Sequence, residues 1–121
     1  MISIETKLKV KDNTGAKIAK CIKIYKKPKG SIGDIILISI QKIKMKKNLK
    51  VLKGDVLKAL IIQTVYKHKN IIQNFINFNE NAVILLKEND QPIGSRILGP
   101  VPFFLRKKKQ FKIISMAVNI I

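Results

Sequence analysis

The chain has 121 residues, enough for one domain with a modest core, and 46% of them are hydrophobic, which excludes a disordered basic tail. Lys and Arg number 25 against 7 Asp and Glu, giving a formal net charge of +18 at pH 7. Because self-repulsion at this charge weakens a small compact state, we expect a polyanionic partner, with nucleic acid as the leading candidate and an anionic membrane surface as the alternative.

Alternating patterns predict strands at the start of the chain. Residues 7–11 read Lys-Leu-Lys-Val-Lys, so we expect a half-buried strand with Leu8 and Val10 inward. Turn residues at 12–15 precede a second strand at 16–26. Cys21 in this strand is expected to fill core space rather than to act as a reactive thiol. The apolar face of the second strand is predicted to carry Ala16, Ile18, Ile22 and Ile24.

Apolar runs predict further strands. The segment 35–44 begins apolar and ends polar, so its far end should leave the core, while 56–66 is apolar on both faces, as a central strand would be. Residues 67–70 are expected to form a turn, followed by strands at 71–78 and 82–86 and a turn at 87–90. Two Pro and two Gly residues in 91–101 predict a bent strand whose route the backbone fixes.

The C-terminal segment changes character. Pro102 can begin a short helix. Phe111, Ile114 and Val118 have helical spacing, which predicts a second helix able to plug one end of a barrel. We expect one mainly β domain over 1–121, with a barrel over roughly 1–101 and a helical segment over roughly 102–121.

Cations gather in loops and on outward strand faces. The stretch 44–53 is the strongest basic patch, and the loop at 26–31 could reach into a phosphate-lined groove, with a solvated hairpin tip as the alternative. Further basic residues flank His68 and follow Leu105. The residues predicted to bind RNA are Lys17, Lys20, Lys23, Lys26, Lys27, Lys29, Lys44, Lys46, Lys47, Lys50, Lys53, Lys67, Lys69, Arg106, Lys107, Lys108 and Lys109.

Arg96 stands apart from these lysines. It is one of only two arginines in the chain, and it lies in the middle of the Pro- and Gly-rich segment. A planar guanidinium on a rigid bent segment indicates a specific contact, although a solvated arginine on an outer strand face is the alternative.

The sequence offers little to an enzyme or a metal. Most of its acids lie at turns, His68 is its only histidine, and Cys21 its only cysteine. No nucleophile-elbow, Walker or zinc spacing occurs, so we expect no catalysis, no cofactor and no metal site. Neither a long apolar span nor a basic amphipathic helix favours the membrane alternative, and no secretion signal opens the chain.

The order of motifs resembles one family. The motifs are Lys11-Asp12-Asn13-Thr14-Gly15-Ala16, Cys21-Ile22-Lys23, Gly33-Asp34-Ile35-Ile36, Lys53-Gly54-Asp55-Val56-Leu57-Lys58-Ala59, Asn81-Ala82-Val83, Gln91-Pro92-Ile93-Gly94-Ser95-Arg96-Ile97 with Gly99-Pro100 after it, and Lys112-Ile113-Ile114-Ser115. In this order and spacing they resemble the universal large-subunit ribosomal protein L-fourteen family, from near Ile4 to Ala117.

This resemblance implies a small five-stranded OB-like β-barrel with a projecting β-ribbon and short C-terminal helices. It also implies a structural protein that binds large-subunit rRNA, contacts neighbouring proteins of the L-three and L-nineteen type, and forms a bridge to small-subunit rRNA. A ribosome silencing factor docks in the family on the surface that matches Ser95, Arg96 and Lys112. The chain departs from the family at Phe75 and Glu80, where glycines are common, and in its short loop at 26–31.

Two questions stay open at this point. A free OB-like binder of single-stranded nucleic acid is the alternative function, although the aromatic residues are scattered and form no visible stacking platform. The abundance of Lys, Ile and Asn with few Arg, Ala and Gly indicates an AT-rich coding sequence. It favours a mitochondrial ribosome for this chain, with no transit peptide expected and with a plastid or the bacterial cytoplasm as alternatives.

Overall fold

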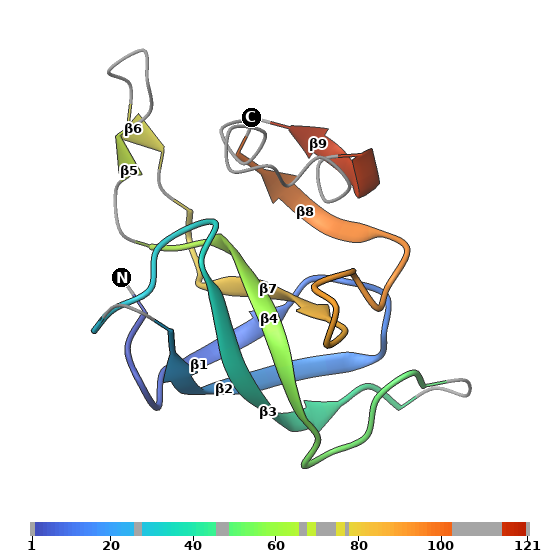
Figure 1. Cartoon of the computed structure of the whole chain (residues 1–121). Coiled ribbons are helices and arrows are strands. Elements are labelled where there is room, and N and C mark those ends of the chain that lie inside the picture. Colours follow the sequence, from blue (N-terminus) through green and yellow to red (C-terminus); the bar gives the residue numbers. More distant parts are fainter. Residues whose placement is uncertain are drawn as a thin grey trace.

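The structure is a computed structural model that describes residues 2–25, 28–45, 49–65, 68–69, 75–76, 78–102 and 115–120. Side chains are described for all of these except 68–69, 75–76 and 117–120. Five strands form a closed barrel in the order β1-β2-β3-β4-β7, and two small sheets, β5–β6 and β8–β9, lie outside it (Figure 1). The strands are β1 (Lys7–Val10), β2 (Ala16–Ile24), β3 (Ile35–Ile43), β4 (Val56–Gln63), β5 (His68–Lys69), β6 (Phe75–Ile76), β7 (Ala82–Leu86), β8 (Ile97–Val101) and β9 (Ala117–Ile120).

The barrel closes through a parallel pair. Neighbours from β1 through β2, β3 and β4 to β7 are antiparallel, and β7 then returns to β1 in parallel, with Lys9 opposite Ala82 and Val10 opposite Val83. Closure leaves the five barrel strands without a free edge, which protects a small β domain from pairing with other chains. The predicted mainly β fold with a five-stranded barrel is therefore confirmed.

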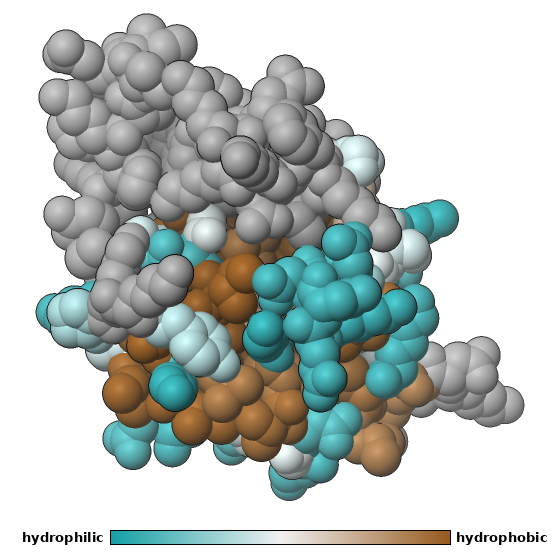
Figure 2. Space-filling view, viewed as in Figure 1, coloured by the Kyte–Doolittle hydropathy of each residue, from teal (hydrophilic) through white to brown (hydrophobic). Residues whose placement is uncertain are grey.

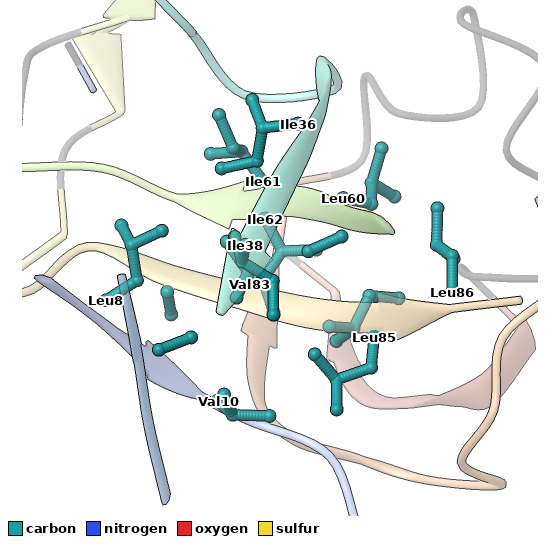
Figure 3. Close-up of a cluster of buried hydrophobic side chains, with 14 of the residues drawn as sticks. Leu8, Val10, Ile36, Ile38, Leu60, Ile61, Ile62, Val83, Leu85 and Leu86 are labelled. Carbon is teal, nitrogen blue, oxygen red and sulfur yellow. The ribbon is translucent and has the colours of Figure 1, made fainter. Parts of the chain in front are cut away.

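Branched aliphatic side chains fill the barrel. Figure 3 shows Leu8 and Val10 of β1 gathered with Ile38 of β3, Ile62 of β4 and Val83 of β7 in one cluster, and all of these are buried. The strict alternation of residues 7–11 thus places Leu8 and Val10 inward, as predicted. Cys21 is also buried, and burial raises the pKa of its thiol above the ordinary value, which confirms it as a core residue.

Two barrel strands are buried on both faces because other segments cover their outer sides. On β4, residues 59–63 are buried, and the amide of Gly33 donates to the carbonyl of Ile61 over 2.8 Å. On β7 all five residues are buried, and the amide of Ile93 donates to the carbonyl of Leu85 over 3.1 Å. Continuous apolar runs are the pattern expected of such doubly covered strands.

The predicted face of the second strand is wrong beyond its first residues. Ala19 and Cys21 are buried, whereas Ile22 is exposed. The pairing of β2 with β3 shifts register between Ala16 and Ile18, between Ile18 and Ala19, and again between Cys21 and Lys23. Each bulge exchanges the inward and outward faces, so a simple alternation cannot be extended across them.

The ribbon also differs from the prediction. Residues 68 and 69, expected in a turn, form β5, which pairs with β6 through His68 opposite Ile76 and Lys69 opposite Phe75. Figure 1 shows β5 and β6 standing away from the barrel. Of the strand expected at 71–78, the described part with strand structure is Phe75–Ile76. The projecting ribbon is confirmed, and its turn lies later in the chain than predicted.

The segment 91–101 is a strand only in its second half. Residues 91–96 bend around the end of the barrel, where Pro92 bridges Leu86, and β8 begins at Ile97, which bridges Asp12. Gly94 permits this close approach, since a Cβ there would lie 2.6 Å from Oδ1 of Asn13. The prediction of a route fixed by Pro and Gly is confirmed, but that of one continuous strand is wrong.

The second predicted helix is wrong at its end. Ser115 and Met116 have helical backbone, but residues 117–120 form β9, parallel to β8. A strand partner supplies hydrogen bonds to this β-branched-rich segment, which outweighs its helical spacing. The helix expected to begin at Pro102 and the start of the second one fall on residues 103–114, outside the described residues.

Candidate nucleic-acid and partner interfaces

Two adjoining hollows on the barrel surface are lined with lysine. The larger, of about 540 Å³, is lined by Lys17, Lys42, Lys44 and Lys53 together with Gln41, Ile43 and Met45. The smaller, of about 250 Å³, is lined by Lys9, Lys11, Lys17 and Lys44 together with Val10, Ile18 and Leu98. Because Lys17 and Lys44 line both, we treat the two hollows as one surface and call it the lysine groove.

Backbone hydrogen bonds fix the position of this groove. The amide of Lys44 donates to the carbonyl of Gly15 over 2.7 Å, and the amide of Lys50 donates to the carbonyl of Thr14 over 3.0 Å. Both ends of the basic loop after β3 are thus tied to the turn that precedes β2. Val51 buries its side chain, and Oδ2 of Asp55 accepts from the amide of Leu52 over 2.9 Å. The loop returns to β4 as an extended segment in its described part, as predicted.

A carboxylate occupies one end of the groove. Glu80 forms ion pairs with Lys9, at 2.8 Å between Oε2 and Nζ, and with Lys11, at 3.2 Å between Oε1 and Nζ. Hydrogen bonds from Lys9 and then Lys11 hold the pKa of Glu80 below its ordinary value. Glu80 is therefore ionised at neutral pH, and it offsets the charge of both lysines.

The structure brings together only part of the predicted RNA-binding set. Lys17, Lys44 and Lys53 line the groove, but Lys20, Lys23, Lys29 and Lys50 do not. Lys23 lies instead over the ring of Tyr25, with Nζ 5.3 Å from the ring centroid. Only the backbone of Lys69 is described. The remaining predicted residues, Lys26, Lys27, Lys46, Lys47, Lys67, Arg106, Lys107, Lys108 and Lys109, lie outside the described residues.

Three lysines of the groove were missed by sequence reasoning. Lys9 and Lys11 project from the lysine-bearing face of β1, and Lys42 from the exposed end of β3. The alternation at 7–11 already placed its lysines outward. What the sequence could not show is that the barrel sets this face beside Lys17 and Lys44, since those contacts join distant parts of the chain.

Ser95 and Arg96 are presented by Asn13. Oδ1 of Asn13 accepts hydrogen bonds from the amides of Ser95, at 2.8 Å, and Arg96, at 3.3 Å, and its Nδ2 donates to Oγ of Ser95 at 2.8 Å. Both Ser95 and Arg96 are exposed. The predicted partner surface thus has an ordered backbone and free side-chain faces. Lys112, predicted on the same surface, lies outside the described residues.

Asp12 organises the same corner from inside. This buried carboxylate accepts from Oγ1 of Thr14 at 2.6 Å and from the amide of Thr14 at 3.2 Å. Its other oxygen accepts from the amide of Leu85 on β7 at 3.0 Å. The segments 11–16 and 91–97, far apart in sequence, therefore meet here, and the amide of Leu98 completes the contact by donating to the carbonyl of Lys11 at 2.6 Å.

Another surface is mostly apolar. Figure 2 shows hydrophobic residues gathered over β3 and β4, with hydrophilic residues beside them. Leu37, Val56 and Leu57 line a hollow there of about 400 Å³, whose only cation is Lys58. Lys58 is paired with Asp90, at 3.2 Å between Nζ and Oδ1. This surface therefore offers little to a phosphate backbone.

A comparison with protein families decides the identity. The model of the family described as Ribosomal protein L14p/L23e matches residues 1–121. The chain belongs to this family. Its members are structural proteins of the large ribosomal subunit, a non-enzymatic kind that binds rRNA and other ribosomal proteins in translation. The ribosome is accordingly the place of this chain.

The described residues hold no feature of another class. Among them, no helix has the length and apolar character needed to cross a membrane. Within the same residues, no three side chains of His, Cys, Asp or Glu gather as metal ligands would.

Proposed function

We propose that this chain binds large-subunit rRNA through the lysine groove, with Lys17, Lys42, Lys44 and Lys53 contacting successive phosphates. The observation that carries the proposal is the convergence of these four side chains on one open hollow, without an acidic residue among its lining. Lysine ammonium groups bind phosphate as point charges and release the counterions of the RNA, which supplies affinity without reading sequence. Exposed Met45 beside them adds an apolar contact for sugar or base.

The surface of Ser95 and Arg96 has a different role in this proposal. We infer that it contacts a protein or the opposite subunit at an intersubunit bridge, because an ordered backbone with a protruding guanidinium suits a directional contact. Neighbouring proteins of the L-three and L-nineteen type, small-subunit rRNA and a ribosome silencing factor are the partners that the resemblance suggests. The composition favours a mitochondrial ribosome.

The salt dependence of RNA binding tests the groove. We expect the double variant Lys17→Gln/Lys44→Gln to lower the slope of log K against log salt by about 1.4 to 1.8, at about 0.7 to 0.9 for each phosphate contact. The measurement is fluorescence titration of a labelled RNA duplex of about 16 base pairs, the length that a compact double-stranded-RNA module spans.

The matched control is Lys58→Gln/Lys87→Gln, which removes the same charge outside the groove. Equal loss of slope in both double variants would show that net charge alone drives binding and would refute the groove. A tighter, saturable complex with short unstructured oligonucleotides than with the duplex would favour the alternative of a free single-strand binder.

A further inference from the structure

Glu80 is positioned by the backbone on both of its sides. On the ribbon side, the amide of Phe78 donates to the carbonyl of Thr64 over 3.0 Å. On the other side, the carbonyl of Asn81 accepts from the amide of Lys9 over 3.0 Å, and its side-chain Oδ1 accepts from the amide of Val65 over 3.0 Å. The short segment 78–81 is therefore held between β4 and β1, and the carboxylate of Glu80 is presented to the lysines of β1 without a mobile linker.

Each oxygen of this carboxylate engages one lysine. Lys9 and Lys11 project from the same face of β1, since they are two residues apart on a strand, and Glu80 bridges them with contacts of 2.8 Å and 3.2 Å. The Glu80 side chain is 33% exposed and that of Lys11 only 24%, so solvent screens their pairing incompletely. A phosphate that approached the two lysines would meet a like charge already bound there.

The groove is therefore divided in two. At one end, Lys9 and Lys11 are engaged by Glu80. At the other, Lys42, Lys44 and Lys53 line a hollow with no acidic lining residue. Lys17 and Lys44 connect the two ends, because they line both hollows. The lysines alone would let an RNA backbone run along the whole groove, and Glu80 is the feature that distinguishes its ends.

We propose that Glu80 occupies the Lys9–Lys11 pair in place of a phosphate and so confines the bound RNA backbone to the Lys17–Lys42–Lys44–Lys53 end of the groove. Glu80 then sets where RNA lies and how many phosphates the protein contacts, while it also fastens the base of the ribbon to β1. This inference rests on the proposed function, since it concerns the same RNA.

The variant Glu80→Gln tests the proposal because it keeps the shape of the side chain and removes its charge. We expect the slope of log K against log salt for the labelled RNA duplex to become steeper by about 1.4 to 1.8, as Lys9 and Lys11 each gain a phosphate. In the unaltered chain, Lys9→Gln/Lys11→Gln should leave the slope unchanged. In the Glu80→Gln background, the same two substitutions should return the slope to its original value.

Asp90→Asn is the matched control, since it frees Lys58 from an ion pair and changes the net charge equally. An identical slope in Glu80→Gln and Asp90→Asn, with or without a loss of thermal stability, would overturn the proposal and leave Glu80 a structural clamp. A lowered slope in Lys9→Gln/Lys11→Gln alone would overturn it as well, and this result does not depend on whether Glu80→Gln folds. Failure of the unaltered chain to bind the duplex would instead refute the proposed function.

Discussion

Asp12 and Asn13 divide the work at one corner of the barrel. Asp12 points inward and ties the turn at 12–15 to β7, while Asn13 points outward and orders Ser95 and Arg96. The sequence identified this turn and singled out Arg96. It could not show that Asn13 accepts from the Arg96 amide, because 83 residues separate the two and only the closed barrel brings them together.

Substitution of Asp12 should weaken the fold more than its size suggests. Asp12→Ala would leave the buried amide of Leu85 and two groups of Thr14 without their acceptor, so we expect the free energy of unfolding to fall by about 2 to 4 kcal/mol. Thr14→Val, which removes only the hydroxyl donor, should cost about 1 kcal/mol. Urea denaturation measures both. Equal losses in the two variants would contradict a role of Asp12 in joining the turn to β7.

Among the elements, strands that other segments cover were predicted better than strands with irregular pairing. The apolar runs of β4 and β7 identify buried strands without any knowledge of their partners. In β2 the bulges that reverse its faces are set by its pairing with β3, so alternation along one strand gave a partly wrong face. The two-residue strands β5 and β6 were equally beyond a local pattern, since each is defined by the other.

Gln63 fastens β8 to the barrel. Its side chain is buried, and Nε2 donates to the carbonyl of Pro100 over 2.8 Å. We expect Gln63→Leu to loosen the segment 97–101, because the carbonyl loses its donor, so that amide hydrogen exchange at Leu98 becomes about 10-fold faster. Gln41→Leu is the control, since Nε2 of Gln41 donates to Ser39 on its own strand. Faster exchange throughout β2 and β3 in the Gln63 variant would indicate global rather than local loosening.

For the molecule as a whole, the net charge of +18 is balanced by few internal contacts. Among the described residues, ion pairs join Glu80 to Lys9 and Lys11, and Asp90 to Lys58. The other described lysines are left to solvent or to a partner, as expected of a ribosomal protein that is stable in contact with RNA. The free chain should therefore suffer from self-repulsion that salt relieves.

Thermal unfolding of the free protein at increasing salt checks this. The Debye length falls from about 10 Å at 0.1 M to about 3 Å at 1 M, so we expect Tm to rise by about 5 °C over this range, equivalent to about 1 kcal/mol for a domain of this size. Lys58→Gln/Lys87→Gln should unfold at a higher temperature than the unaltered chain at low salt, and the difference should shrink at high salt. A Tm that falls with salt would mean that attractive pairs outweigh repulsion.

The sequence by itself determined the class of this protein, its β character, its turns and its family, because these depend on local pattern, composition and the order of motifs along the chain. Only the tertiary structure decided which lysines form a groove, that Glu80 divides it, and that Asn13 holds Ser95 and Arg96. Each of these features depends on contacts between residues distant in sequence, and strand register and barrel closure set those contacts. The segment 91–101 shows both, since its Pro and Gly residues announced a bend, and the turn at 12–15 decided where that bend lies.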